Sequence, residues 1–208
     1  MVKSAFGQVP TTIAAIDGSR ILLLCTGNQC RSPMAEGLLR DLVRRRGLHA
    51  TVDSAGMLGG GMPATSTAAD VLAERGIDLS GHCSRSLTDP ELALATADLV
   101  LTMERRHLRE AVRTEPSIRD RTFTLVDAVR RAEATMPRHP DETLRAWAER
   151  LGAGRSRADA EGIGDDEVPD PIGQPRRIYE ATADRLADLL GRLLDRAFPN
   201  ALDSERSA

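Results

Sequence analysis

The chain has 208 residues, of which 41% are hydrophobic and 28% are charged, and its formal net charge is -3. This length suits one domain with a well-buried core; no apolar run approaches the ~20 residues of a membrane span, and the balanced charge gives no reason to expect nucleic acid as a partner. The N-terminus lacks a secretory signal and the three cysteines are irregularly spaced, so we expect a cytoplasmic protein with reduced thiols.

The first predicted elements surround a short loop. Residues 1–19 mix small and polar residues without periodicity and are predicted to form a loose N-terminal extension. Residues 21–24 are a continuous apolar run, typical of a parallel strand buried on both faces. Apolar residues at helical spacing then predict a helix over residues 33–46, with Ser32 as its N-cap and Pro33 at its first position.

The alternation of strand and helix then repeats along the chain. We expect further strands at residues 51–54, 98–103 and 122–125, and further helices at residues 66–75, 104–112 and 175–198. This order predicts an α/β fold: a single domain with a four-stranded parallel sheet flanked by helices, in a flavodoxin-like or Rossmann-like three-layer arrangement. The domain is expected to cover residues 20–199, with a disordered tail at residues 200–208.

Residues 127–167 interrupt this alternation. They are predicted to hold one helix, at residues 141–151, followed by a run rich in Gly, Arg and Asp. Two interpretations are open: a lid beside the functional site, or an exposed insertion that packs on the surface, which is the commoner outcome for such segments.

The loop after the first strand, CTGNQCRS at residues 25–32, carries the strongest chemical signal. It lies at the carboxyl edge of a parallel sheet, where ligands bind in open α/β folds, and its N–H groups at a helix N-terminus would cradle a phosphate-like anion. Gly27 and Asn28 tolerate the left-handed backbone that such a loop needs. Arg31 adds two parallel donors for oxyanion oxygens, and the same environment favours the nucleophilic thiolate form of Cys25.

Two other interpretations of Cys25 and Cys30 are open. A cysteine at the end of an apolar strand is often a small buried hydrophobe, and Cys25 with Cys30 might form half of a metal site. The remaining Cys83 and the four histidines show no paired ligand spacing, so the sequence predicts no metal and no cofactor. Cys83 is expected to be a semi-buried bystander and His107 a solvent-facing residue of the third helix.

The segment CTGNQCRSPMAE, residues 25–36, resembles the phosphate-binding loop of the low-molecular-weight protein tyrosine phosphatase family, which includes a bacterial protein-arginine phosphatase and arsenate reductase-like branch. The likeness extends to Ser-Ala-Gly at residues 54–56, His-Cys-Ser-Arg at 82–85, the strand at 97–103 and Asp-Pro at 170–171. Together these motifs cover roughly residues 21–126 and 168–197, in the order found in the family.

The resemblance implies a cysteine-dependent phosphatase that hydrolyses phosphotyrosine-type phosphomonoesters on phosphorylated proteins. Cys25 would attack phosphorus and form a phosphocysteine intermediate, while Arg31 and the loop amides hold the phosphoryl oxygens. Asp170 would protonate the leaving group and then activate the water that releases phosphate. Inorganic phosphate, or another oxyanion, would bind as product or inhibitor.

The resemblance also implies roles for residues around these three. The residues expected to form the phosphate-binding loop with Cys25 and Arg31 are Thr26, Gly27, Asn28, Gln29, Cys30 and Ser32. Ser32 would donate a hydrogen bond to the thiolate, and Asn28, Ser54 and His82 would brace the loop. Cys30 would form a reversible disulfide with oxidised Cys25.

The chain departs from the family where substrates are selected. Tyrosine-specific members place aromatic residues at the positions of Met57–Gly61 and Ile172–Gly173, so the walls that stack on a phenyl ring are absent. Gln29 stands where the arginine-specific branch favours threonine and the tyrosine-specific enzymes favour an apolar residue.

Three alternatives to a tyrosine phosphatase therefore remain open. One is a protein-arginine phosphatase that uses the same site. Another is a thiol-coupled arsenate reductase, for which only Cys30 and Cys83 could supply the further thiols. The last is a non-enzymatic oxyanion-binding scaffold, and the sequence does not predict an oligomeric state.

Overall fold

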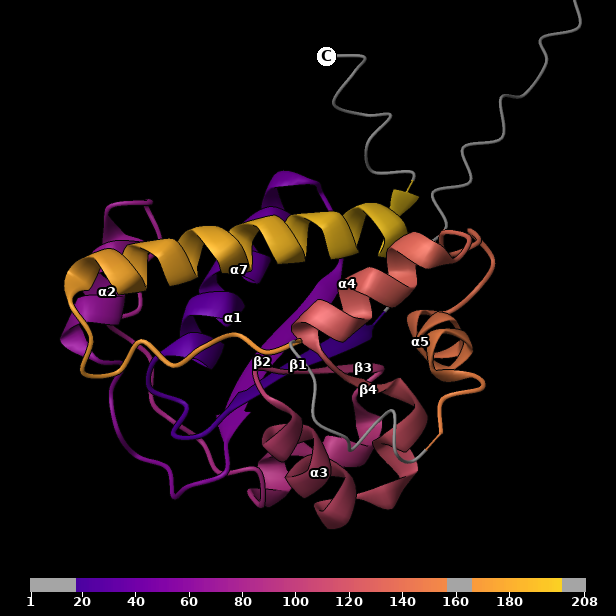
Figure 1. Cartoon of the computed structure of the whole chain (residues 1–208), viewed down its shortest axis with the longest axis horizontal. Coiled ribbons are helices and arrows are strands. Elements are labelled where there is room, and N and C mark those ends of the chain that lie inside the picture. The colour runs from indigo at the N-terminus through magenta and orange to yellow at the C-terminus, as the bar shows by residue number, and fades with distance from the viewer. Residues whose placement is uncertain (1–17, 157–165, 200–208) are drawn as a thin grey trace, which may run out of the picture.

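Four parallel strands form the centre of the molecule, in the order β2-β1-β3-β4 (Figure 1). The computed structural model describes residues 18–156 and 166–199, so most of the predicted N-terminal extension, residues 157–165 and the predicted C-terminal tail lie outside the described residues. The strands are β1 (Ser19–Cys25), β2 (Ala50–Gly56), β3 (Leu99–Thr102) and β4 (Thr122–Thr124). The prediction of an α/β fold with a four-stranded parallel sheet is confirmed.

Helices cover both faces of this sheet. Among residues 18–156 and 166–199, the α-helices are α1 (Arg31–Arg45), α2 (Ser66–Ala73), α3 (Arg105–Thr114), α4 (Leu125–Ala134), α5 (Leu144–Gly152) and α7 (Arg176–Ala197). Three short 3-10 helices, η1 (Pro90–Leu92), η2 (Leu94–Thr96) and η3 (Pro116–Arg121), lie around β3 and α3 in the chain. In Figure 1, α7 runs above α1 and α4, whereas α3 lies on the opposite side of the sheet.

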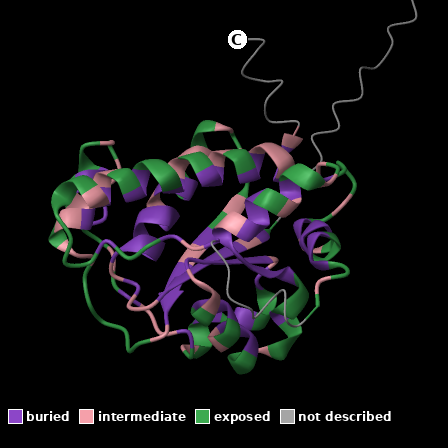
Figure 2. Ribbon diagram, in the orientation of Figure 1, coloured by how far each residue is buried: buried purple, intermediate pink, exposed green. Residues whose placement is uncertain are grey.

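The alternation of side chains along β1 divides the core in two. Ile21 and Leu23 belong to a large hydrophobic cluster that includes residues of α1, α2, α4, α5 and α7. Leu22 and Leu24 point the other way, into a smaller cluster with Ala111 of α3. The strands are consequently buried on both faces, as the apolar run in the sequence predicts, and they form the buried centre of Figure 2.

β1 begins at Ser19, before the apolar run from which we predicted it. Ser19 and Arg20 pair with Ala50 and Thr51 of β2, and the backbone N–H of Arg20 donates to Asp98 at 2.8 Å. Backbone pairing therefore extends the strand into residues whose side chains carry no strand pattern.

The predicted N-cap of the first helix is wrong. α1 begins at Arg31, its N-cap is Cys30, and no side chain caps it. The hydroxyl of Ser32 lies instead 2.9 Å from the sulfur of Cys25, so the residue is committed to the loop and not to the helix end.

The prediction of a single helix in residues 127–167 is also wrong. α4 precedes α5, and its buried residues Leu125, Ala128, Val129 and Ala132 follow helical spacing. Trp147 of α5 is fully buried in the same large cluster. Both helices are thus part of the core, which is not what an exposed insertion predicts. Residues 157–165 of this region lie outside the described residues.

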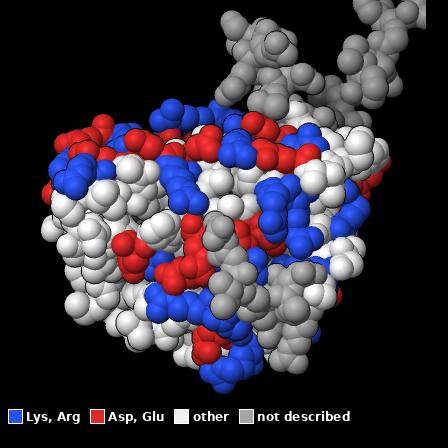
Figure 3. Space-filling view, in the orientation of Figure 1, with Lys and Arg blue, Asp and Glu red and all other residues white. Residues whose placement is uncertain are grey.

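Acidic and basic side chains are intermixed over the face shown in Figure 3, in keeping with the nearly balanced charge of the sequence. None of the helices in the described part of the chain is long and apolar enough to cross a membrane.

Trp147 offers a test of how firmly α5 belongs to the core. Its side chain is fully buried, and its Nε1 has no hydrogen-bond partner among the described residues. We expect Trp147→Ala to lower the free energy of unfolding by about 3–5 kcal/mol, because it leaves a large cavity. Trp147→Phe should cost clearly less, since it keeps an aromatic ring and removes the unpaired N–H. Equal losses in urea unfolding followed by circular dichroism would contradict this packing.

Candidate active site

The candidate site lies where β1 turns into α1. β1 ends at Cys25 and α1 begins at Arg31, so the five residues between them form a loop at the carboxyl edge of the sheet. The loop has one non-glycine residue with positive φ, Asn28, at 51°. Asparagine is among the few side chains that adopt this conformation readily.

The side chain of Asn28 is fully buried, and both its amide nitrogen and its amide oxygen form hydrogen bonds. Its Nδ2 donates to the hydroxyls of Ser32 at 3.0 Å and Ser54 at 2.7 Å, and its Oδ1 accepts from the backbone N–H of Arg85 at 2.8 Å. His82 donates from Nε2 to the carbonyl of Asn28 at 2.7 Å. One residue therefore joins the loop to α1, to β2 and to the segment containing His82 and Arg85.

The last residue of β2 lies directly against the loop. A Cβ on Gly56 would sit 2.8 Å from both the amide nitrogen of Asn28 and the carbonyl oxygen of Thr26, closer than such atoms approach. The carbonyl of Thr26 also accepts from Met57 at 2.8 Å. This close approach explains why glycine ends the Ser-Ala-Gly motif.

The remaining loop residues are partly accessible. Gly27 and Gln29 are half-buried, and the carbonyl of Gln29 accepts from the backbone N–H of Thr65 at 2.8 Å. The side-chain nitrogen of Gln29 lies 3.5 Å from the point where a Cβ on Gly27 would be, so this side chain folds back over the loop.

Cys25 and Ser32 face each other inside the loop. Their side-chain sulfur and oxygen are 2.9 Å apart, and Cys25 is 3% exposed. The oxygen of Ser32 accepts from Asn28, and its hydroxyl proton has two acceptors in reach, the sulfur of Cys25 and the carbonyl of Ala55 at the longer distance of 3.5 Å. The arrangement can hydrogen-bond a thiolate.

Arg31 is held by two carboxylates and a carbonyl. Its guanidinium, 1% exposed, donates from Nη1 to Glu104 and to the carbonyl of Val168 at 3.0 Å, and from Nη2 to Asp170 at 2.6 Å. Its Nε is buried and has no hydrogen-bond partner among the described residues. Asp170 is about one-third exposed and also accepts from the backbone N–H of Ile172 at 3.3 Å. A buried donor is thus left without an acceptor beside the loop.

Sequence reasoning missed Glu104, which follows β3 at the same sheet edge. Burial alone would raise the pKa of Glu104, but hydrogen bonds from Arg106 and Arg31 lower it to about 2, so the carboxylate is ionised. The position of Glu104 directly after a predicted strand was the available signal, because the carboxyl ends of parallel strands share one edge.

The prediction that His107 faces solvent is wrong. It is 1% exposed, not solvent-facing, and its Nε2 lies 3.0 Å from the hydroxyl of Thr26 in the loop. Its Nδ1 accepts from the backbone N–H of Glu104 at 3.1 Å. Burial lowers the pKa of His107 to about 4, so the imidazole is neutral near pH 7.

Residues 20–142, more than half of the chain, match the family of low molecular weight phosphotyrosine protein phosphatases. The chain belongs to this family. It therefore belongs to a class of phosphoprotein hydrolases, as its motifs predict.

Two curated relatives and one solved structure illustrate the similarity. The low molecular weight protein-tyrosine-phosphatase Etp of Escherichia coli (strain K12) is 39% identical over 116 residues, which cover 53% of this chain and 72% of the relative. A protein-arginine-phosphatase of Bacillus subtilis (strain 168) is 33% identical over 174 residues, covering 83% and 93%. The crystal structure of the low molecular weight protein tyrosine phosphatase from T. tengcongensis superposes with a TM-score of 0.64 at 34% identity, covering 85% of this chain and 98% of that one.

The other two cysteines of this phosphatase lie in different environments. Cys30 is 1% exposed, and burial, with the charges of Asp170 and Cys25, raises its pKa to about 12, so it is a neutral thiol. Cys83 is exposed, contrary to the expected semi-buried position. In the described parts of the chain, no three His, Cys, Asp or Glu side chains are grouped as metal ligands.

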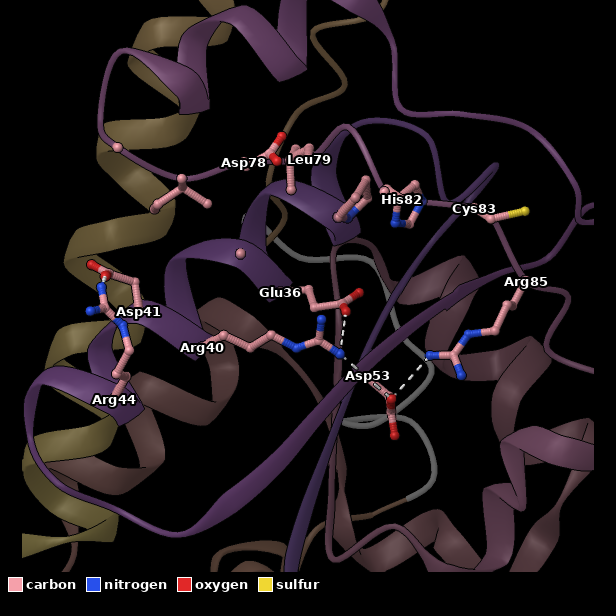
Figure 4. A pocket seen from close by; sticks show the side chains of 15 residues that line it. Glu36, Arg40, Asp41, Arg44, Asp53, Asp78, Leu79, His82, Cys83 and Arg85 are labelled. Atoms are coloured by element: carbon pink, nitrogen blue, oxygen red, sulfur yellow. Dashed lines mark hydrogen bonds and ion pairs between the residues drawn. The ribbon is translucent and has the colours of Figure 1, made fainter.

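A charged groove of about 670 Å³ lies behind the loop, between α1 and residues 76–85 (Figure 4). Glu36 accepts a hydrogen bond from the hydroxyl of Ser54 and pairs with Arg40 at 2.7 Å. Across the groove, Arg85 pairs with Asp53 at 3.1 Å. Because Ser54 and Arg85 also bond Asn28, these ion pairs support the loop from its far side.

The buried imidazole predicts acid sensitivity. Between pH 6.5, the ordinary pKa of histidine, and pH 4, the unfolded chain binds more protons at His107 than the folded protein does. The free energy of unfolding should therefore fall by up to about 3 kcal/mol over this interval on account of His107, and Glu104 should add a further loss between pH 4.5 and pH 2.

Urea unfolding at several pH values tests this dependence. His107→Gln should flatten the slope between pH 6.5 and pH 4, whereas His139→Gln, which changes an exposed histidine, should leave it as in the unaltered protein. A variant at His107 that loses stability as steeply as the unaltered protein would contradict the assignment.

Proposed function

We propose that this protein is a cysteine-dependent phosphatase that hydrolyses phosphotyrosine-type phosphomonoesters on proteins through a phosphocysteine intermediate. The observation that carries the proposal is the buried Nε of Arg31, which lacks an acceptor among the described residues although its guanidinium lies at a loop that begins with Cys25. An oxyanion bound in the loop would satisfy this donor.

The first half of the reaction uses the loop and Asp170. The phosphoryl group displaces the carboxylate of Asp170 from Nη2 of Arg31, and the loop N–H groups and Arg31 hold its equatorial oxygens. The thiolate of Cys25 attacks phosphorus in line, a sulfur–phosphorus bond forms and the bond to the leaving oxygen breaks. Asp170, once displaced from Arg31, takes up a proton from solvent and gives it to that oxygen.

In the second half, water releases the phosphate. The Asp170 carboxylate takes a proton from a water molecule, whose oxygen attacks phosphorus, and the thiolate of Cys25 leaves. The hydroxyl of Ser32 stabilises this thiolate, since it lies 2.9 Å from the sulfur. Asn28, Ser54 and His82 keep the loop in shape throughout, through the hydrogen bonds that converge on Asn28.

Cys30 has a protective role in this proposal. When a peroxide oxidises Cys25 to a sulfenic acid, the sulfur of Cys30 attacks the sulfur of Cys25, water leaves and a disulfide forms, which an external thiol can reduce again. In the reduced protein, Cys30 is a neutral thiol because burial raises its pKa to about 12. The chemistry requires a reduced thiol, and all three cysteines are free, so we infer that the protein works in a reducing compartment such as the cytoplasm.

Substitutions of Cys25 and Asp170 test the mechanism with aryl phosphates. Cys25→Ser should abolish turnover, whereas Cys83→Ser, which changes an exposed thiol outside the loop, should not. Asp170→Ala should slow substrates with poor leaving groups by roughly 10²–10⁴-fold and those with good leaving groups far less, because only the former need a proton. Turnover by Cys25→Ser, or an equal loss on all leaving groups in Asp170→Ala, would overturn these roles.

A second candidate is a protein-arginine phosphatase. It is favoured by the aliphatic rim, since Leu58 is 56% and Ile172 51% exposed where an aromatic wall would stack on a phenyl ring. The similarity to the Bacillus subtilis protein-arginine-phosphatase also covers more of this chain than the similarity to Etp does.

Steady-state rates on matched peptides decide between the substrates. We expect kcat/KM for a phosphotyrosine peptide to exceed that for a phosphoserine peptide, with phosphoarginine as the competing substrate. A higher value for phosphoarginine would establish the second candidate. Consumption of arsenate coupled to a thiol would support an arsenate reductase instead, and phosphate binding without turnover would support a scaffold.

A further inference from the structure

Three donors converge on the hydroxyl of Thr26, the residue that follows Cys25. His107 Nε2 lies 3.0 Å from this oxygen, Arg106 Nη2 lies 2.9 Å away and Arg31 Nη2 lies 3.4 Å away. Two of these donors belong to α3, on the opposite face of the sheet from α1. The hydroxyl of Thr26 therefore links α3 to the start of the loop and to Arg31.

The surroundings of His107 fix which of its ring nitrogens carries the proton. Nδ1 faces the backbone N–H of Glu104 at 3.1 Å and can only accept there. In the neutral imidazole the proton is consequently on Nε2, which donates it to Thr26. The ring is 1% exposed, so water does not compete for either hydrogen bond.

We propose that His107 is a positioning residue of the reaction: its Nε2–H holds the hydroxyl of Thr26, and thereby holds the loop next to Cys25 and Nη2 of Arg31 in the geometry that binds a phosphoryl group. This inference rests on the phosphatase function proposed above. His107 touches neither the sulfur nor the guanidinium, so it acts through Thr26.

Each ring nitrogen of His107 has its own partner, so the positioning role can be distinguished from capping of α3. Nδ1 serves the helix, because it accepts from Glu104 at the N-cap, and Nε2 serves the loop. An asparagine at this position can replace the acceptor at Nδ1 but is too short to reach Thr26. A glutamine can place a donor near the position of Nε2. The pair His107→Asn and His107→Gln thus removes one function at a time.

The test measures the affinity for inorganic phosphate, from the protection that phosphate gives Cys25 against alkylation by iodoacetamide. His107→Asn should weaken phosphate binding roughly threefold to tenfold, the loss expected for one buried hydrogen bond, and His107→Gln should restore most of it. Thr26→Val should weaken phosphate binding to a similar extent. The two losses should not add: the double variant Thr26→Val/His107→Asn should bind phosphate about as well as the single variant with the lower affinity.

Val112→Ala is the matched control for stability. Val112 is buried on α3 with Leu108, away from Thr26, so this variant loosens α3 and should leave phosphate affinity unchanged. Unaltered phosphate affinity in His107→Asn, or additive losses in the double variant, would overturn the proposal. Because alkylation and phosphate binding are measured without turnover, an inactive unaltered protein that still shows this pattern would refute the phosphatase function and not the link between His107 and the loop.

Discussion

The buried amide of Asn28 is the constraint on which the site depends. The residue combines a left-handed backbone, with φ of 51°, and four hydrogen bonds through its side chain and carbonyl. Glycine would supply the backbone conformation without the amide, and most other residues would supply neither. The loop, β2 and the segment that carries His82 and Arg85 are therefore held by one side chain, and the ion pairs of the groove behind it stabilise those partners in turn.

The second constraint on the site is the charge balance around Arg31. A fully buried guanidinium is costly without anions beside it, and Arg31 has two, Glu104 and Asp170. Of the two, Asp170 is the more exposed, and in the proposed mechanism an incoming phosphoryl group replaces its carboxylate while Glu104 keeps Arg31 oriented. The exchange substitutes one anion for another on Arg31, and it releases Asp170 toward the leaving group in the proposed mechanism.

The sequence predicted those features whose cause is local. The apolar run of β1, the helical spacing of α1 and α7, and the residue types of the loop are readable because each depends on near neighbours in the chain. Burial of His107 depends on Thr26, 81 positions away, and the commitment of Ser32 to the loop depends on where the sulfur of Cys25 lies. α4 was missed although its apolar spacing is regular, because residues 127–167 were interpreted as one interruption of the alternation that holds a single helix.

Binding of inorganic phosphate to Asn28→Gly tests the account most directly. This variant keeps the freedom to adopt positive φ and removes the side-chain hydrogen bonds that hold the loop. The account predicts that phosphate, measured by calorimetric titration, binds weaker by about tenfold or more, with the fold retained by circular dichroism. Phosphate affinity equal to that of the unaltered protein would show that the loop holds its shape without Asn28, and would contradict the central claim.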